Sequence, residues 1–500
     1  MRRTAIVALF ILAATLRLVH LGYSDYQGDE IKALFNPKAA QSIQFFLEQR
    51  KGPAQFLVTA GLKLFTPDYR NRLLVRLPFA LAGFGSVLVF YLAIKEIVSQ
   101  KVAFYSTLFF ATNGFFVAFS RLVQYQSLVI FFGLLAIWLT AKYTKTARLR
   151  YLVLAFMSWA LSALAHYDAV FFAPIILGLL INQLFIFKDK TLRVVLFRHF
   201  LVAAAVFLVL AGVFYLPFIF NIAQSTADYW AGRISGNVSS KISSSRYLFS
   251  VYQPIYVLHL YTLLLIGGLA VAGLNLLNKF QLVNFPRLIW AILIWFLFPL
   301  LIIEVLIYIP GTHIYTYLIP GCLLMGFVLS YIEHLIAIYV KPLKPLIPVG
   351  LWIMTLFLFL QSYYIFVDHQ SEYPWEQKRF LIWTLPKPTP IFHLSIFGFP
   401  YYRHWDEVGD YIAADQQADY YTTNERVSIA RYHINLEKDG ERAGYYVYIK
   451  QPQTFTDEIT NEGIVNWVAT HPPVAEFQNN SRVVTQIFLV NRNEPVTSSN

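Results

Sequence analysis

The sequence has little charge for its length. Asp, Glu, Lys and Arg make up only 14% of its 500 residues, whereas hydrophobic residues make up 57% and the mean hydropathy is +0.52. A water-soluble chain of this size needs many more polar side chains to cover its surface. The composition therefore excludes a soluble protein and indicates a polytopic membrane protein.

Cysteine is nearly absent as well. The single Cys322 lies inside an apolar run, so no disulfide can form within the chain and we expect the thiol to be inert packing. Neither a Walker A motif nor a dinucleotide-binding fingerprint is present, and the sequence therefore gives no sign of a nucleotide site.

The cations that are present follow a topological pattern. The net charge is +12, but many Lys and Arg residues form short clusters between apolar runs, which is typical of cytoplasmic loops rather than of a nucleic-acid surface. We therefore expect membrane lipids as partners and no nucleic acid.

Eleven segments are apolar and long enough to be predicted as membrane-spanning helices. They fall near residues 4–22, 77–94, 102–119, 122–141, 151–165, 169–187, 200–220, 253–277, 288–309, 314–339 and 346–366. The first is interpreted as an uncleaved helix rather than a signal peptide, because it contains Arg17 and His20 and no small-residue cleavage site follows.

The positive-inside rule orients these spans. With the N-terminus in the cytoplasm, every inner connection is basic, the clearest being 142–150 with four cations. An odd number of spans then places the C-terminus outside. We expect a multi-pass protein of the plasma (inner) membrane with a cytoplasmic N-terminus and an extracytoplasmic C-terminus.

Two outer loops and the C-terminal region are long enough to fold. The loop 23–76 contains a predicted interfacial amphipathic helix at 31–50, and a second long outer loop covers 221–252. After the last span the composition becomes mixed and Tyr-rich, with a predicted helix at 404–416 and a strand at 444–450. The expected architecture is an all-α membrane domain, 1–366, followed by a small extracytoplasmic α/β domain, 367–500.

The residues able to carry chemistry gather on the outer side of the predicted topology. They come from separate loops and include carboxylates, imidazoles and cations, as expected for a pocket that binds an anionic headgroup. They are Asp29, Glu30, Lys51, Arg76, Arg121, Gln126, His166, Tyr167, Asp168, His313 and Tyr315.

Each of these residues also has a structural interpretation. Asp29 and Glu30 could form a solvated surface pair, and Lys51 could be a solvated cation. Arg121 could anchor a helix end among lipid headgroups, and His166 and His313 could be satisfied interfacial histidines. Their joint placement on one side of the membrane favours a functional site.

In order and topology these residues resemble the GT-C superfamily of membrane glycosyltransferases, in particular the family 39-like group of protein O-mannosyltransferases and the lipid A aminoarabinose transferase. The resemblance covers roughly residues 1–335. The motifs that carry it are Asp29-Glu30, Lys51-Gly52-Pro53, Leu64-Phe65, Arg76-Leu77-Pro78, the segment SRLVQYQSL at 120–128, AHYDA at 165–169 and HIYTYLIP at 313–320.

The resemblance implies an enzyme that transfers a sugar from a polyprenyl-phosphate donor to a lipid, glycan or protein acceptor at the outer face, with inversion. It implies catalytic roles for Asp29 and Glu30, and binding of the lipid phosphate or sugar by the other residues listed above. Many relatives have an acid at the position of Gln126, which leaves Asp29 as the main candidate base. No cofactor is certain, and the sequence leaves open whether a divalent cation is needed.

A transporter or flippase of a lipid-linked glycan is the main alternative, since it would also be polytopic and basic inside. Transporters commonly have paired repeats and ionisable groups at the membrane midplane. Glu304 and Glu333 lie toward the ends of their predicted spans instead. A scaffold protein is a weaker alternative, because it leaves the outer residues unexplained.

The predicted topology can be tested with reporter fusions. A reporter fused after Ser498 should be active outside the cytoplasm and one fused at Lys145 inside, because of the odd span count and the four cations at 142–150. Cytoplasmic activity of the C-terminal fusion would contradict the topology.

Overall fold

The computed structural model describes residues 3–37, 42–186, 189–236, 258–277, 286–308, 311–373, 375, 378–385, 397–439, 444–454 and 458–490. The chain forms two compact units, each of which is described by itself. The helical unit comprises Met1–Val19, Phe35–Gly61 and Leu77–Tyr363, and the mixed unit comprises His20–Leu34, Leu62–Arg76 and Tyr364–Asn500.

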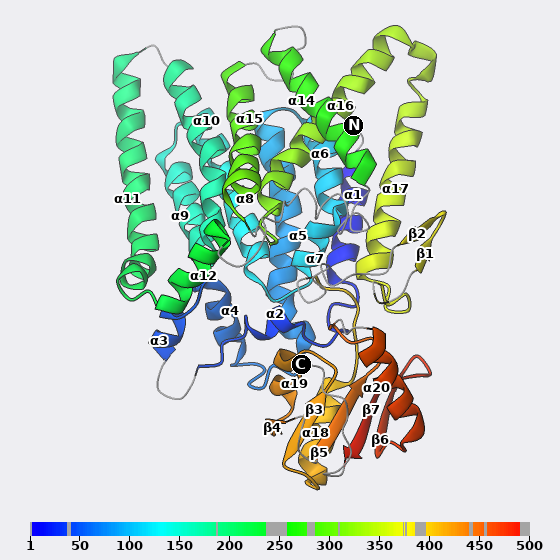
Figure 1. The fold of residues 1–500 in the computed structure, drawn as a ribbon. Coiled ribbons are helices and arrows are strands. Elements are labelled where there is room, and N and C mark those ends of the chain that lie inside the picture. Colours follow the sequence, from blue (N-terminus) through cyan, green and yellow to red (C-terminus); the bar gives the residue numbers. More distant parts are fainter. Residues whose placement is uncertain are drawn as a thin grey trace. The chain divides into compact units, whose positions relative to one another are not determined.

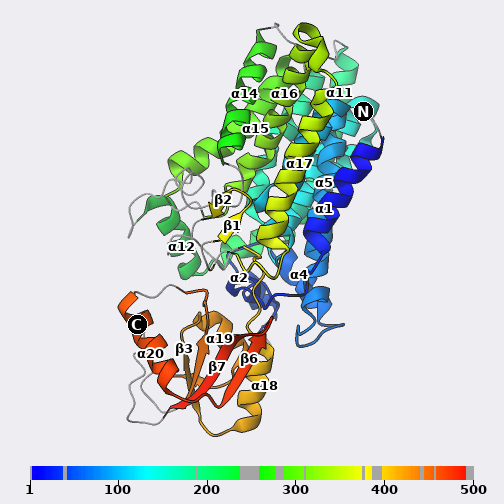
Figure 2. The ribbon, with the colours of Figure 1, turned by 90° about the vertical axis from the view of Figure 1, so that its right-hand side faces the viewer.

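The helical unit is a bundle of long apolar helices (Figures 1 and 2). Its helices are α1 (Arg3–Leu18), α3 (Ser42–Leu47), α4 (Ala54–Leu62), α5 (Arg72–Ile97), α6 (Gln100–Thr112), α7 (Gly114–Ser120), α8 (Tyr125–Thr146), α9 (Leu149–Ala165), η1 (Tyr167–Phe172), α10 (Ala173–Ile186), α11 (Lys190–Phe220), α12 (Gln224–Ser235), α14 (Leu258–Leu276), α15 (Pro286–Leu301), η4 (Ile302–Leu306), α16 (Tyr315–Tyr339), η5 (Lys341–Leu343) and α17 (Leu346–Phe366).

Among the described residues, eight helices are long and apolar enough to cross a membrane, or nine if α6 and α7 form one bent span. Each of the eleven predicted spans coincides with a helix or with consecutive helical segments. Two further helices in predicted spans, α1 and α9, have 16 and 17 residues. They are shorter than the 18 residues that each of the eight helices has at least. The predicted fold class, a helical multi-pass membrane protein with a small C-terminal sheet region, is confirmed.

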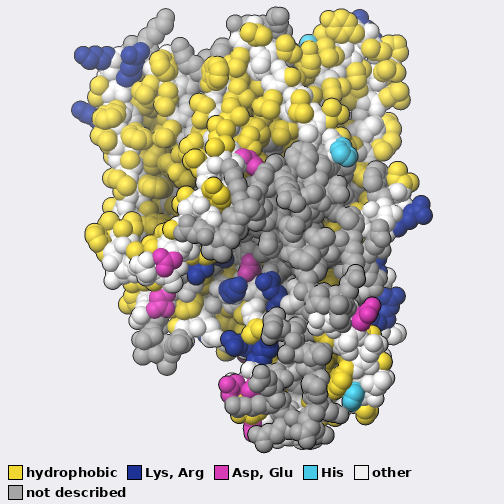
Figure 3. All heavy atoms as spheres, viewed as in Figure 1, with side chains coloured by type: hydrophobic (Ala, Val, Ile, Leu, Met, Phe, Trp, Pro, Cys, Tyr) yellow, Lys and Arg dark blue, Asp and Glu magenta, His cyan; other side chains and the backbone are white. Residues whose placement is uncertain are grey.

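The surface of the helical unit agrees with a hydrocarbon environment. In Figure 3 hydrophobic side chains predominate on the coloured part of its visible face, with Lys and Arg at the end where α11 begins. Helices suit such an environment because all of their backbone hydrogen bonds close within the segment. Lys190 and Arg193 occupy the first turn of α11, the end that the positive-inside rule assigns to the cytoplasm.

The predicted third span is broken at Asn113. This residue ends α6 and caps α7, where its side-chain oxygen accepts a hydrogen bond from the amide of Phe115, and the two helices bend by 63°. Asn is a preferred N-cap because its side chain satisfies an amide that the new helix leaves unpaired. The bend sets the direction of α7 and of the short connection to α8 that carries Arg121 and Gln124.

A buried arginine ties the first helix to the bundle. Arg17 is fully buried, and its Nη1 donates to the carbonyls of Ala13 at 3.2 Å and Ala111 at 2.9 Å. Burial of a cation is costly unless it is hydrogen-bonded, so these bonds stabilise the packing of α1 against the end of α6.

The mixed unit is built on a five-stranded sheet with strand order β4-β3-β5-β7-β6. Strand β3 is parallel to β4 and β5, while β7 is antiparallel to β5 and β6. The strands are β3 (Tyr420–Thr423), β4 (Glu437–Lys438), β5 (Gly444–Ile449), β6 (Ala475–Asn479) and β7 (Arg482–Val490). The helices are α2 (Gly28–Ile31), α18 (Trp405–Asp415), α19 (Val427–His433) and α20 (Glu458–Thr470), and a separate hairpin joins β1 (Lys378–Phe380) to β2 (Trp383–Leu385).

The sheet follows from the sequence pattern. Tyr446, Ile464, Phe488 and Val490 form a buried core with Trp467 of α20 packed against it. The predicted strand at 444–450 and the predicted helix at 404–416 both form, as β5 and α18.

The segment after α1 folds with the C-terminal residues of the mixed unit. The amide of Asp25 donates to the carbonyl of Tyr401 at 2.8 Å, and the amide of Arg403 donates to the Asp25 carboxylate at 2.6 Å. Residues 20–34 are therefore part of the same unit as the sheet, although more than 360 positions separate them along the chain. The proposed domain boundary at residue 366 stays a prediction.

The predicted amphipathic helix at 31–50 is wrong. Among the described residues of that range, helix is confined to Ile31 at the end of α2 and to α3, and residues 38–41 lie outside the described part of the chain. Pro37 explains the break, because a proline disfavours helical geometry at the residue before it. The second outer loop, 221–252, contains the helix α12, and its remainder from 237 lies outside the described residues.

Candidate functional site

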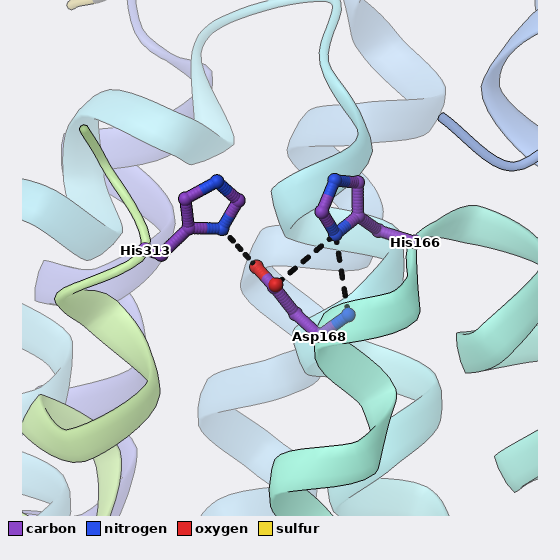
Figure 4. Close-up of side chains that lie close together, drawn as sticks. All are labelled: His166, Asp168 and His313. Carbon is purple, nitrogen blue, oxygen red and sulfur yellow. Dashed lines mark hydrogen bonds and ion pairs between the residues drawn. The ribbon is translucent and has the colours of Figure 1, made fainter. Parts of the chain in front are cut away.

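Three polar side chains converge inside the helical unit, and we call them the His–Asp–His cluster: His166, Asp168 and His313. In Figure 4 both imidazoles point toward the Asp168 carboxylate. Nδ1 of His166 lies 3.2 Å from Oδ1, and Nδ1 of His313 lies 2.7 Å from Oδ2. His166 and Asp168 are buried, and the His313 side chain is 12% exposed.

Local structure brings the cluster together. His166 ends α9, and its Nδ1 accepts a hydrogen bond from the amide of Asp168 at 3.2 Å, which caps the 3-10 turn η1. His313 lies in the turn before α16. That turn begins at Gly311 with φ +57°, where glycine avoids steric strain and where a Cβ would also meet the guanidinium of Arg233 at 2.5 Å.

Aromatic rings hold the cluster in place. The ring of Tyr125 stacks on His166 with centroids 4.0 Å apart, and Tyr167 contacts the same imidazole at 3.8 Å. The hydroxyl of Tyr315 donates to Oδ2 of Asp168 at 2.7 Å. Burial lowers the pKa of His166 to about 4 although Asp168 acts in the opposite direction, so this imidazole is neutral at pH 7.

Cations and tyrosines lie next to the His–Asp–His cluster. Nζ of Lys51 lies 4.9 Å from the centroid of Tyr125, the ring that stacks on His166. The guanidinium carbons of Arg50 and Arg233 lie 4.0 and 5.3 Å from the Tyr229 centroid. We call Arg50, Lys51, Tyr125, Tyr229 and Arg233 the cation–aromatic cluster.

Gly52 explains how Lys51 reaches this position. A Cβ on Gly52 would lie 2.0 Å from the carbonyl oxygen of Leu164, so only glycine permits the loop to approach the end of α9 this closely. The close approach places Lys51 and Pro53, the neighbours of Gly52, near the end of α9, which His166 follows. The motif Lys51-Gly52-Pro53 therefore has a steric reason for its central residue.

Sequence reasoning missed Arg233. It lies in the last turn of α12, a helix whose Trp230 contacts the ring of Tyr167 edge-on at 5.9 Å. A cation near the end of an amphipathic stretch in a long outer loop was the available signal. The sequence that follows, GNVSSKISSS at 236–245, is rich in Ser and Gly and favours a loop instead.

The other predicted residues of the helical unit have different environments. Gln126 donates from Nε2 to Oγ1 of Thr312 at 3.3 Å, next to His313. Arg121 is buried, and its Nη1 donates to the carbonyls of Leu16 at 3.1 Å and Val19 at 2.9 Å. These bonds stabilise the end of α1 through backbone carbonyls.

Asp29, Glu30 and Arg76 belong to the mixed unit. Glu30 is fully buried, and its two carboxylate oxygens each accept a hydrogen bond from the Arg76 guanidinium at 2.8 Å. Arg76 also donates to the carbonyls of Leu21, Ser24 and Asp25. The Asp29 side chain is 30% exposed and lies 3.4 Å from Nζ of Lys32. Glu30 therefore fixes the helical turn on which Asp29 is presented.

A second buried ion-pair network in the mixed unit was also missed. Nη2 of Arg72 forms an ion pair with Oδ1 of Asp25 at 2.8 Å and donates a hydrogen bond to the Asp406 carboxylate. Burial raises the pKa of Asp25, and the charge of Arg72 opposes this rise. No local motif marks Asp25 and Asp406 as partners, because more than 380 positions separate them.

The structure thus groups the predicted residues in two sets. The helical unit brings Lys51, Gln126, His166, Tyr167, Asp168, His313 and Tyr315 into one connected neighbourhood. The mixed unit brings Glu30 and Arg76 into direct contact beside Asp29.

The chain is similar to known proteins in sequence and in structure. A sequence model of the family described as "Dolichyl-phosphate-mannose-protein mannosyltransferase" matches residues 51–216. The crystal structure of ArnT from Cupriavidus metallidurans in the apo state is 11% identical, with a TM-score of 0.53 over 97% of this chain and 98% of that chain.

The chain has the GT-C fold. ArnT from the same organism bound to undecaprenyl phosphate is 12% identical, with a TM-score of 0.50 over the whole of both chains. A curated relative, "Putative mannosyltransferase YkcB" of Bacillus subtilis (strain 168), is 40% identical over 82 residues, which are 16% of this chain and 12% of that protein's length. The predicted resemblance to GT-C membrane glycosyltransferases is confirmed.

The Glu30–Arg76 pair predicts a large effect on stability. Glu30→Gln should lower the free energy of unfolding by about 3–5 kcal/mol, because it leaves the buried Arg76 charge without its partner. The measurement is thermal unfolding of the purified, detergent-solubilised chain. Asp29→Asn is the matched control, because that side chain is partly exposed and its ion pair is weak. Equal unfolding temperatures for the two variants would contradict the structural role of Glu30.

Proposed function

We propose that this chain is a membrane glycosyltransferase that moves a sugar from a polyprenyl-phosphate-linked donor to an acceptor hydroxyl at the outer face of the membrane, with inversion at the anomeric carbon. The fold and the family match support this class of reaction. Undecaprenyl phosphate, the molecule bound by one of the structures with this fold, is a polyprenyl phosphate.

The observation that carries the proposal is the cation–aromatic cluster. Lys51 and Arg233 are held against tyrosine rings beside the buried His–Asp–His cluster. When the bond between the anomeric carbon and the phosphate oxygen breaks, negative charge grows on the departing phosphate. Charged donors stabilise this charge most strongly where water is partly excluded.

Asp29 is proposed as the general base. As the acceptor oxygen bonds to the anomeric carbon, its proton passes to the Asp29 carboxylate, and the polyprenyl phosphate leaves with the electrons of the broken bond. The partial exposure of Asp29 suits a base that must meet an acceptor from solution. Glu30 acts through position, since both of its oxygens are occupied by Arg76.

The remaining predicted residues keep the role of binding the phosphate or the sugar. Tyr rings, imidazoles and amides are suitable partners for sugar hydroxyls and faces. The residues in this group are Arg76, Arg121, Gln126, His166, Tyr167, Asp168, His313 and Tyr315. The acceptor is proposed to be a lipid, a glycan or a protein.

The proposed location follows from the charge pattern. A plasma (inner) membrane with the N-terminus in the cytoplasm and the C-terminus outside puts the proposed catalytic residues on the extracytoplasmic side, where polyprenyl-phosphate sugars serve as donors in place of cytoplasmic nucleotide sugars. The same orientation puts the mixed unit's C-terminal residues outside.

The flippase alternative is not favoured. The family that matches residues 51–216 is described as a mannosyltransferase family. ArnT, which has a similar fold, agrees with the same predicted enzyme class. A flippase would also leave the base proposed at Asp29 without a task.

Asp29→Asn tests the proposed base. Asn has nearly the same volume but takes up no proton at neutral pH, so transfer should fall by about 10²–10⁴-fold while expression and membrane insertion stay unchanged. The assay follows release of polyprenyl phosphate from a polyprenyl-phosphate sugar by the purified chain, with folding checked by the elution profile. Turnover like that of the wild type in a well-folded variant would rule out Asp29 as the base.

Lys51→Ala tests the proposed phosphate contact in the same assay. Loss of one charge-assisted donor from the transition state should reduce turnover by about 10²-fold. Lys190→Ala removes an exposed lysine at the start of α11 and should leave turnover unchanged. If both variants lose activity equally, overall charge rather than a specific contact controls the reaction.

A further inference from the structure

The ring nitrogens of the His–Asp–His cluster lie close to one buried carboxylate, that of Asp168. Nδ1 of His166 accepts a hydrogen bond from the amide of Asp168, so this nitrogen carries a lone pair and no proton. The same nitrogen faces Oδ1 of the Asp168 carboxylate at 3.2 Å. Because Nδ1 has one lone pair, a metal ion bound there takes the place of the amide hydrogen bond. The charge of the buried Asp168 carboxylate favours a cation at this position.

The ligand atoms have the spacing of a metal site. One nitrogen of each histidine and one oxygen of Asp168 all lie within 4.8 Å of one another. Ligands bound to one zinc ion at about 2.0–2.2 Å lie roughly 3.0–3.5 Å apart. The contact between His166 and Asp168 already has this separation, and small side-chain rotations would close the widest distance.

The donor set selects the kind of metal. Two imidazole nitrogens and one carboxylate oxygen suit zinc and its neighbours, whereas magnesium and calcium prefer shells made of oxygen alone. Three protein ligands leave a fourth position open, as in catalytic rather than structural zinc sites.

We infer that His166, Asp168 and His313 bind one divalent cation of the zinc class, with an open coordination position for an anionic oxygen. Their surroundings are those of an organised site. The hydroxyl of Tyr315 donates to the Asp168 carboxylate at 2.7 Å, and the stacked ring of Tyr125 fixes the plane of His166. Such outer contacts orient metal ligands in known sites.

The cation has a role in the proposed transfer. Lys51 lies over the other ring of the Tyr125–His166 stack, so a phosphate that contacts Lys51 can place an oxygen on the open position. This role rests on the proposed function, whereas binding of the metal itself does not.

Metal binding is tested directly, without substrate. The purified full-length chain is stripped with a chelator and titrated with Zn²⁺ by calorimetry, and with Co²⁺ by visible absorption, which reports the coordination geometry. The wild type should bind one ion per chain. His313→Gln removes a ligand and should weaken binding by more than about 100-fold, and Tyr315→Phe, which removes only an outer contact, should weaken it by about 10–100-fold.

His199→Gln is the matched control. His199 lies in the same unit and also has a tyrosine partner, since its Nδ1 is 3.0 Å from the Tyr143 hydroxyl, but it is outside the cluster. Its loss should leave affinity and stoichiometry unchanged. Less than one ion per wild-type chain, or equal affinity of wild type and His313→Gln, would overturn the inference. One bound ion in a chain that transfers no sugar would uphold the metal site and reject the proposed transfer instead.

Discussion

The need to pair every buried charge governs both units of this protein. Glu30 and Arg76 are almost fully buried and form two parallel hydrogen bonds of 2.8 Å. Taking either charge out of water alone costs several kcal/mol, so each residue is tolerated only in the presence of the other. Arg76 also binds three backbone carbonyls of residues 21–25. One ion pair thereby fixes the path of residues 21–30 within the mixed unit and the position of Asp29.

The buried charged side chains of the helical unit also have bonding partners. The Asp168 carboxylate is buried among helices and is satisfied by Tyr315 and His313. Arg17 and Arg121, the buried arginines at the end of α1, are bonded to backbone carbonyls. A buried polar group that is held by several partners, as these are, has a well-defined position. This makes them suitable for binding a charged ligand at a fixed place.

Much of the fold was predictable because its signals are local. Apolar runs and the cations between them gave all eleven helical segments, and alternation gave β5. The helix predicted at 31–50 failed because Pro37 and the packing of the segment outweigh its amphipathic pattern. The grouping of His166, Asp168 and His313 was also predictable, since the topology put both connections on one side. Arg233 and the Asp25–Arg72–Asp406 network were not, because their partners are distant in sequence and no period or motif links them.

Gly52 has a consequence for how this protein can be changed. The backbone there passes so close to Leu164 that the loop and the end of α9 have complementary shapes, with no room for even a methyl group between them. Each surface can therefore vary only together with the other. A chimera that takes the Lys51-Gly52-Pro53 loop from a relative with a different middle residue needs the end of α9, including His166, from the same source.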